Sequence, residues 1–483
     1  MLVLALLLSF SACSSTKDAY IYFELPSPPA TLDPQTASQD SELLIIKNAF
    51  EGLLRKNAKG EIVCGAAKEY ETDGLNYTFI LRNDIKWHNG DSLTAADFEF
   101  AFKRAVSPET NAPFVSRLFC IKNAEDIYNG RSKADSLGVK AVNETTLVIN
   151  LETNDEYFLE TLTTSISMPC NQKFFEEAAG KYGLFANNIL SNGSYKLTRW
   201  RKDPFGIRLY RNDEYSGEFV SENAAVFLTC DKDEAAFEKL KKNSVDISFI
   251  DCALTDEAAT EGLKTYEFEN ICWFLTMSDK LSPNMRKSFS LLLGGEVFSK
   301  SLENGYSPAA SIFPIGCFDI KISNGIAAYN PEAAKKLYLQ ELNKLQGKKF
   351  PSDIVLYYYD DGYVKNAVTD IVGHWQSNFS AFVNIEAASE AELLTSQLKD
   401  QTYAMALFPV KADSALVAEY LKKFGVKYNG KSLADIQSQL LKDNSIVPVM
   451  FQKTVIAYSH SLSNIFIDKG NGYIDFAFIV KSE

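Results

Sequence analysis

The sequence has very few histidines and none of the common catalytic motifs. Only His88, His374 and His460 occur in 483 residues, and they stand far apart along the chain. The chain lacks a GxSxG nucleophile elbow, a Walker loop, a GxGxxG turn after a strand, an HExxH helix and an EF-hand loop. A serine or cysteine hydrolase needs a histidine beside its nucleophile, and isolated histidines do not indicate such a pair. These absences favour a binding protein over an enzyme.

Patterns for metals and nucleic acids are absent as well. The 8 cysteines include no CxxC pair, which disfavours a structural zinc site. The net charge is −13, whereas a nucleic-acid-binding protein needs a basic surface. We therefore expect no metal, no cofactor and no nucleic-acid partner. After Cys13, most cysteines are expected to be free thiols, although Cys230, Cys252 and Cys272 leave room for one disulfide bond.

No apolar run is long enough to span a bilayer as a helix, but a short one opens the chain. Leu2–Leu8 are apolar, and mostly small residues follow, so residues 1–12 are predicted to be a removed signal peptide. An apolar segment followed by a cysteine, here Cys13, resembles a bacterial lipoprotein signal, in which the cysteine is acylated. We expect lipidation of Cys13 and a tether over residues 13–19. The alternative is a simple secretory signal peptide that happens to contain a cysteine.

Short strand patterns alternate with helix patterns along the rest of the chain, which indicates an α/β architecture without long linkers. Apolar residues at helical spacing predict a helix over residues 41–54. Its possible N-caps are Ser38, Asp40 and Ser41. Thr94 and Asp97 form a capping-box pattern at the start of another helix.

The second half of the chain contains a strand–helix–strand pattern. A strand over 353–360 precedes a helix over 364–379, and Val383 begins the next strand. This order predicts a βαβ unit and therefore a parallel sheet. Residues 403–408 are expected to add another strand to it. Earlier in the chain, alternating apolar residues predict a strand over 77–82.

A series of motifs then identifies the class of protein. The motifs are TLDP (31–34), EGLL (51–54), YTFILR (77–82), KWHNGDSLTAADF (86–98), FKRAVSPETNAPF (102–114), SNGSYKLTRW (191–200), IRLYRNDEYSGE (207–218), YNPEAAKKL (329–337) and IVPVMF (446–451). In this order they resemble the peptide/nickel family of ATP-binding-cassette solute-binding proteins. The segment 102–114 is closest to the oligopeptide-binding branch, and the likeness covers about residues 20–455.

The resemblance implies an α/β fold of two lobes with mixed sheets, a hinge between the lobes, and an extra α+β domain. Lobe I is expected to be discontinuous and to consist of residues 20–57, 191–277 and 457–483. The extra domain is expected over 58–190 and lobe II over 278–456. Ligand is expected in the cleft between the lobes, which close around it.

The resemblance also implies where ligand is bound. In the oligopeptide branch an aspartate of lobe II pairs with the α-ammonium of the peptide, and the matching segment here is FPVKADS (408–414). Asp413 and Ala412 match the family pattern, while Val410 stands for a pocket tryptophan and Ser414 for a tyrosine. The predicted ligand-binding residues are Asp413, Ala412, Phe408 and Val410. A solvated loop carboxylate is the alternative for Asp413.

The sequence therefore predicts a monomeric, lipid-anchored protein of the periplasm or cell surface that binds short peptides. It would deliver them to the membrane subunits of an ATP-binding-cassette permease and would not be an enzyme. One alternative is the same fold with another ligand, such as a dipeptide, haem or a small hydrophobic molecule. Another is a structural or adhesive lipoprotein that has lost transport.

Overall fold

The computed structural model describes most of the chain after the predicted tether. The described residues are 20–202, 205–219, 221, 223–230, 234–293, 305–314, 317, 328–345, 349–351, 354–360, 364–389, 403–412, 417–426, 432–468 and 472–482. Cys13, Asp413 and Ser414 lie outside these residues. Within them, no helix is long and apolar enough to cross a membrane.

The predicted ranges serve as names for the parts of the chain, which begins in lobe I and continues into the extra domain. The elements of lobe I in this part are β1 (Tyr20–Glu24), α1 (Asp40–Ala49) and β2 (Leu54–Lys56). Those of the extra domain are β3 (Ile62–Cys64), β4 (Ala67–Thr72), β5 (Asn76–Leu81), α2 (Ala95–Ala105), η1 (Val115–Leu118), α3 (Ala124–Tyr128), η2 (Ala134–Ser136), β6 (Val139–Asn143), β7 (Thr146–Asn150), α4 (Phe158–Thr161), η3 (Ser165–Ser167), α5 (Gln172–Glu177) and η4 (Ala186–Asn188).

The chain returns to lobe I, crosses to lobe II and comes back. The returning elements are β8 (Tyr195–Lys202), β9 (Phe205–Arg211), β10 (Ala225–Thr229), α6 (Ala236–Lys241), β11 (Ile247–Ile250), η5 (Cys252–Leu254), α7 (Thr255–Thr260) and β12 (Lys264–Met277). Lobe II contains α8 (Pro283–Ser290), β13 (Tyr306–Pro308), α10 (Pro331–Leu342), β14 (Val355–Tyr359), α11 (Val364–Phe379), β15 (Asn384–Ala388), β16 (Met405–Lys411), α13 (Val417–Lys422) and α14 (Leu433–Leu440). The chain ends with β17 (Ile446–Tyr458), β18 (Leu462–Ser463), β19 (Phe466–Ile467), β20 (Ile474–Asp475), η9 (Phe476–Phe478) and β21 (Val480–Lys481).

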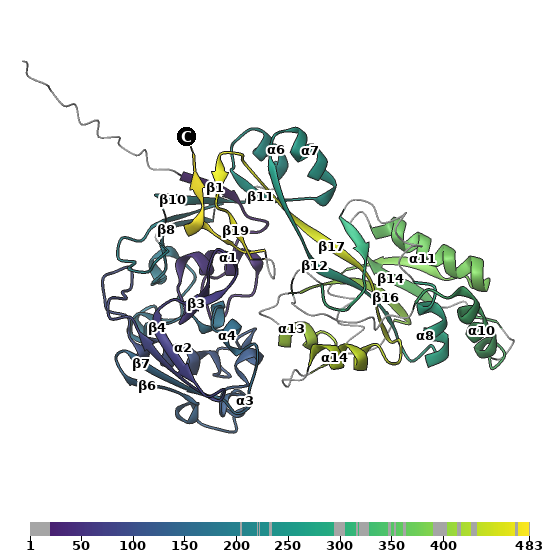
Figure 1. Cartoon of the computed structure of the whole chain (residues 1–483), viewed down its shortest axis with the longest axis horizontal. Coiled ribbons are helices and arrows are strands. Elements are labelled where there is room, and N and C mark those ends of the chain that lie inside the picture. Colours follow the sequence, from purple (N-terminus) through teal and green to yellow (C-terminus); the bar gives the residue numbers. More distant parts are fainter. Residues whose placement is uncertain are drawn as a thin grey trace, which may run out of the picture.

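One 11-stranded mixed sheet runs through both lobes in the order β15-β14-β16-β12-β17-β11-β1-β10-β9-β8, with β13 on β17. The long strands β12 and β17 pair along their whole length and connect the two halves (Figure 1). The β11 strand pairs with one end of β17, and β16 pairs with the opposite end of β12. The pairing shifts register between Glu269 and Ile271. A bulge of this kind interrupts the ladder and bends a strand, so it marks the position expected for the hinge.

The predicted βαβ unit is confirmed. The β14 strand pairs in parallel with both β15 and β16, and α11 connects β14 to β15. The helix buries the face that includes Val368, Ile371 and Trp375, as its apolar spacing predicts. Alternation along β16 directs Leu407 into one buried cluster of lobe II and Phe408 into the other, because successive side chains of a strand point to opposite faces.

The extra domain is built on a separate sheet, ordered β4-β5-β7-β6, and covered by α2. Its Phe79 belongs to the same buried cluster as Phe23 of lobe I, so these two parts of the chain share one hydrophobic core. The predicted capping box is present at the start of α2, where Asp97 accepts a hydrogen bond of 2.8 Å from the backbone N–H of Thr94. No disulfide bond joins any of the seven cysteines after Cys13, all of which are among the described residues.

Two details of the predicted first helix are wrong. Its N-cap is Gln39, because the buried Glu42 carboxylate reaches back and accepts the backbone N–H groups of Ser38 (2.8 Å) and Gln39 (3.0 Å). The helix ends at Ala49 instead of continuing to residue 54, and the next residue has an extended backbone. Contacts with a distant segment explain the difference, since the carbonyl oxygen of Ala49 accepts the N–H of Gly193 (2.8 Å) and the N–H of Glu51 donates to Oδ1 of Asn192 (3.0 Å).

Candidate ligand-binding site

The predicted ligand-binding segment begins beside the two long connecting strands. The N–H of Ala412, directly after β16, donates a hydrogen bond of 2.7 Å to the carbonyl oxygen of Asn270. Asn270 is fully buried at the bulge of β12, and its Oδ1 atom accepts a hydrogen bond of 2.7 Å from Thr454 of β17. These two contacts fix the segment that leads to Asp413 against both connecting strands.

The described members of the predicted site are buried in the core of lobe II. Phe408, Val410 and Ala412 point to the same face of β16 and are at most 1% exposed. They pack in a cluster with α13 and α14, against residues such as Tyr420. None of the three lines the cavity described below. Their contact with ligand therefore stays a prediction, as does that of Asp413, which lies outside the described residues.

A cavity lies between the extra domain and lobe II, where α13 approaches η1. Its volume is about 950 Å³, close to the upper end of the range for small-molecule sites. On one side it is lined by residues from 111–128 and 152–161, and on the other by Val417, Lys422, Gly425 and Val426. Tyr157 of the extra domain also packs against the buried cluster of lobe II. The cavity therefore has one wall on each of two bodies that the connecting strands hold together.

The cavity wall carries both signs of charge and several aromatic rings. Its charged residues are Arg117, Glu125, Glu152, Asp155 and Lys422. Its aromatic residues are Phe119, Tyr128 and Tyr157. Convergent polar groups within a largely apolar wall are typical of a site that orients a ligand.

Burial changes the acidity of two cavity groups. It raises the pKa of Asp155, although the backbone N–H of Tyr157 stabilises the carboxylate through a hydrogen bond of 2.9 Å. Burial, together with the negative charge of Glu156, raises the pKa of the Tyr157 hydroxyl to about 12. The Tyr157 hydroxyl is therefore un-ionised at neutral pH and keeps its proton.

Reasoning from the sequence did not identify these cavity residues. Asn111, Ala112 and Pro113 belong to one of the family motifs, but no sequence pattern indicates that this motif lies beside the cavity. The sequence contained little indication of the cavity, because the residues from 152–161 and α13 lie far apart in the sequence.

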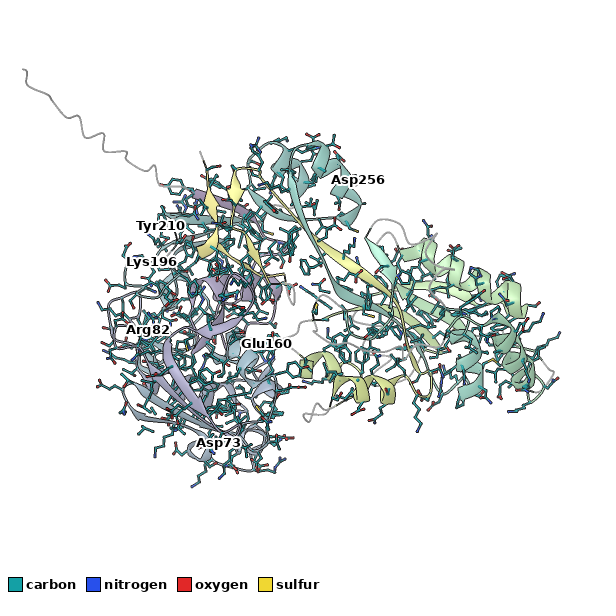
Figure 2. All side chains as sticks on the ribbon, in the orientation of Figure 1. Asp73, Arg82, Glu160, Lys196, Tyr210 and Asp256 are labelled. Carbon is teal, nitrogen blue, oxygen red and sulfur yellow. The ribbon has the colours of Figure 1, made fainter. Side chains whose placement is uncertain are left out.

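Figure 2 shows which edge of the extra domain faces lobe II. Glu160 of α4, labelled there, lies at this edge.

An ion pair also joins lobe I to lobe II. Lys411 of β16 approaches Asp40 of α1, with 2.5 Å between Nζ and Oδ2. The side chains are 35% and 51% exposed, so the pair is expected to contribute at most about 1 kcal/mol.

Replacing Lys411 by alanine should shift the ligand-free protein toward a more open arrangement of the lobes. Small-angle scattering at low salt should show a larger radius of gyration than for the wild type, and high salt should remove the difference. Lys453→Ala is a matched control, because Lys453 of β17 pairs with Glu267 of the adjacent strand β12 at 3.0 Å with similar exposure, so this pair lies along the connecting strands and does not tie α1 to β16. An equal change in both variants would contradict an inter-lobe role for Lys411.

Several family motifs meet in one buried network away from the cavity. The Glu51 carboxylate accepts hydrogen bonds from Arg82 (2.8 Å), Arg55 (3.2 Å) and the Tyr215 hydroxyl. Asn192 exchanges hydrogen bonds with the backbone of Glu51, at 3.0 and 2.8 Å. These motif residues hold lobe I and the extra domain together, so their role is structural.

Among the described residues, a hydrogen bond joins a serine hydroxyl to a histidine ring, but the pair is inaccessible. Ser191 is fully buried, its Oγ atom lies 3.1 Å from Nδ1 of His88, and its N–H donates to the same nitrogen at 3.0 Å. Burial lowers the pKa of His88. Neither residue lines the cavity. The described residues also contain no group of three or more His, Cys, Asp or Glu placed to hold a metal ion.

Comparison with known proteins agrees with this architecture. The model of the bacterial extracellular solute-binding proteins, family 5 middle, matches residues 61–434. The oligopeptide-binding protein OppA of Bacillus subtilis (strain 168) is 29% identical over 442 residues, which cover 84% of this chain and 78% of the relative.

Solved structures show the same fold. OppA of Burkholderia pseudomallei superposes with a TM-score of 0.77 at 19% identity, over 96% of this chain and 99% of that one. The pheromone receptor PrgZ, whose structure describes its mode of peptide binding, gives a TM-score of 0.76 at 21% identity, over 97% of this chain and all of PrgZ (100%). The family model covers well over half of the chain, and the cavity lies between two bodies joined by long strands. This protein therefore belongs to family 5 of the bacterial extracellular solute-binding proteins.

Proposed function

We propose that this protein is a lipid-anchored, extracytoplasmic receptor that captures short peptides between its lobes and delivers them to an ATP-binding-cassette importer. The observation that carries the proposal is the cavity of about 950 Å³ shared by the extra domain and α13 of lobe II. A peptide in its usual ionic form carries a positive and a negative end, and the wall offers both Glu152 and Lys422. Ligand bound there would contact both bodies and stabilise their closed arrangement.

A screen of short peptides tests this function. A peptide present at 100 times its dissociation constant should stabilise the folded protein by about 2.7 kcal/mol, because it binds only the folded state. The melting temperature should rise, and scattering should show a smaller radius of gyration. Protein first freed of co-purified ligand gives the baseline. No stabilisation by any peptide would contradict the proposal and favour a structural lipoprotein or a ligand of another class.

We further propose that Asp413 pairs with the α-ammonium of the peptide. A carboxylate in the closed cleft would compensate the buried charge, and removing one partner of such a pair typically costs 2–5 kcal/mol. Asp413→Asn should therefore weaken binding of a free-amine peptide by at least about tenfold. Binding of the N-acetylated peptide, already weak, should barely change. Equal affinity of variant and wild type for the free-amine peptide would refute this role.

The lipid anchor is tested separately at Cys13. Acyl chains at one site anchor a protein because each buried CH₂ contributes about 0.8 kcal/mol. Cys13→Ser should move the protein from the detergent phase to the aqueous phase in a phase-partitioning experiment. Retention of the variant in the detergent phase would contradict lipidation at this residue.

A further inference from the structure

The outer face of the sheet in lobe I carries exposed aromatic side chains. In β1, Ile21 and Phe23 are fully buried in the core. Tyr20 and Tyr22 point to the opposite face and are 38% and 39% exposed. Alternation along the strand produces this division, since successive side chains point to opposite sides of a sheet. The opposite face has no core to cover there, yet it presents large aromatic rings where small polar residues would suffice.

The strand register gathers further residues on the same face. Phe227 of β10 is paired with Tyr22 of β1 and with Arg208 of β9, while Tyr20 and Tyr210 both pair with Ala225. The Phe227 ring lies 5.5 Å from that of Tyr20, 5.2 Å from that of Tyr22 and 6.3 Å from that of Tyr210. The guanidinium of Arg208 lies 5.3 Å from the centre of the Phe227 ring. We call Tyr20, Tyr22, Tyr210 and Phe227 the aromatic face.

The adjoining hairpin of β8 and β9 is strongly basic. Its cationic residues are Lys196, Arg199, Arg201, Lys202, Arg208 and Arg211, against one acidic residue, Asp203. The whole chain has a net charge of −13, so this concentration of positive charge is local. Asp213 lies near Lys196 and Arg211, at 3.5 and 4.0 Å. Lys481 adds a cation 5.6 Å from the Tyr22 ring, although it also pairs with Asp246 at 2.8 Å.

The aromatic face lies close to the predicted lipid anchor. Only residues 14–19 separate Cys13 from Tyr20, and seven fully extended Cα–Cα steps reach at most about 25 Å. Figure 2 shows Tyr210 and Lys196 on the side of lobe I where the described chain begins. In the large sheet, β8, β9 and β10 form one end and the lobe II strands β14 and β15 form the other. Contact at this end would leave lobe II free to move.

From these observations we infer that the aromatic face and the basic hairpin rest on an anionic membrane surface. The inference rests on the proposed lipid anchor, which would hold this side of lobe I near the bilayer. Tyrosine is enriched at the membrane–water interface because its ring is apolar and its hydroxyl is polar. Lysine and arginine are attracted to anionic headgroups, and the attraction decays within a Debye length. The combined surface therefore orients the anchored protein, with lobe I on the membrane and the other end of the sheet in water.

Vesicle binding by the mature chain without lipid tests the surface directly. Residues 13–483, produced without the signal peptide and unacylated, keep every described residue. They should bind vesicles with about 30% phosphatidylglycerol at least about tenfold more tightly than pure phosphatidylcholine vesicles, and salt near about 0.5 M should abolish the difference. In addition, Tyr20 and Tyr22 should become protected from hydroxyl-radical labelling on the anionic vesicles, while the exposed Phe382 of lobe II should not.

Two sets of substitutions with equal change of charge locate the contact. Arg199→Glu, Arg201→Glu and Arg208→Glu replace side chains that form no ion pair among the described residues and that the strand register places on the face of Phe227. Together they should reduce binding at least about tenfold. The control set, Lys335→Glu, Lys336→Glu and Lys365→Glu, lies on α10 and α11 of lobe II and should leave binding within about twofold. Circular dichroism checks the fold of both variants.

Absent or lipid-independent binding by the wild-type chain would overturn the inference, and so would equal losses in the two variants. If the charge-reversed variant fails to fold, the dependence of wild-type vesicle binding on lipid and salt still tests the inference. The peptide screen on the same preparation separates this inference from the proposed function. A chain that binds peptides but not anionic vesicles refutes the membrane surface alone, and the reverse result refutes peptide capture alone.

Discussion

Replacing Glu51 by alanine should lower the free energy of unfolding by about 3–5 kcal/mol, the usual cost of removing one partner from a buried ion pair. Glu51 is 4% exposed and interacts with Arg55, Arg82 and Tyr215. Arg55 keeps a second partner, Asp475 at 2.6 Å, but the other carboxylate near Arg82 is Asp84 at 3.9 Å, which is 62% exposed. The variant therefore leaves a largely buried guanidinium without its principal counter-charge.

The effect is expected to be structural and to act between two parts of the chain. Arg82, labelled in Figure 2, lies at the end of β5 in the extra domain, whereas Glu51 and Tyr215 belong to lobe I. Burial raises the pKa of the Tyr215 hydroxyl, and the charge of Glu51 raises it further, so this hydroxyl remains protonated and donates to the carboxylate. Loss of Glu51 should weaken the junction and accelerate hydrogen exchange on both sides of it.

The measurement is the urea midpoint and the free energy of unfolding derived from it. Glu71→Ala is the matched control, because Glu71 is an exposed carboxylate on β4 of the same extra domain, and its replacement should change stability by about 0.5 kcal/mol or less. Equal midpoints for Glu51→Ala and Glu71→Ala would contradict the role of the network.

Replacing Arg104 by methionine should cost a similar amount, about 3–5 kcal/mol. Arg104 of α2 donates one hydrogen bond to Asp33 and another, of 2.6 Å, to Gln35, and all three residues are buried. Its guanidinium also lies 4.3 Å from the centre of the Phe175 ring. Burial lowers the pKa of Arg104, but the Asp33 carboxylate more than offsets this, so the pKa is raised and the guanidinium stays charged. Methionine fills much of the space and leaves the Asp33 charge buried.

A double-mutant cycle tests the pair. Asp33→Asn with Arg104→Met should cost less than the sum of the two single variants, because neither partner is then left as an unpaired buried charge. Arg131→Met, which removes an exposed ion pair with Asp126 in the same domain, should cost about 1 kcal/mol or less. Additive losses in the cycle would show that Asp33 and Arg104 do not act as a pair.

Local patterns in the sequence predicted the elements because their causes are local. Apolar spacing over 364–379 gave α11, and alternation in the flanking segments gave β14 and β15 in parallel. Thr94 and Asp97 gave the start of α2, since a capping box involves residues within one turn. The end of the first helix at Ala49 was mispredicted, because the hydrogen bonds that replace the helical ones there come from Asn192 and Gly193, more than a hundred residues away.

The order of motifs identified the family but not the contacts that the motif residues make with one another. Glu51, Asn192 and Tyr215 are far apart in the sequence, and only the fold brings them into one network. The predicted site segment is joined to the connecting strands through Ala412 and Asn270, which no sequence pattern indicated. The cavity residues near Asp155 were missed for the same reason, since their partners on α13 come from the other lobe.

The sequence by itself determined the class of protein, the α/β architecture and most secondary structure, because propensity, periodicity and capping act over a few residues. Tertiary structure alone decided which charges are buried together, which face of lobe I is left aromatic and exposed, and which residues line the cavity. These features depend on contacts between segments distant in the chain. A residue such as Glu51 acquires its large energetic role only when folding removes it from water beside Arg82.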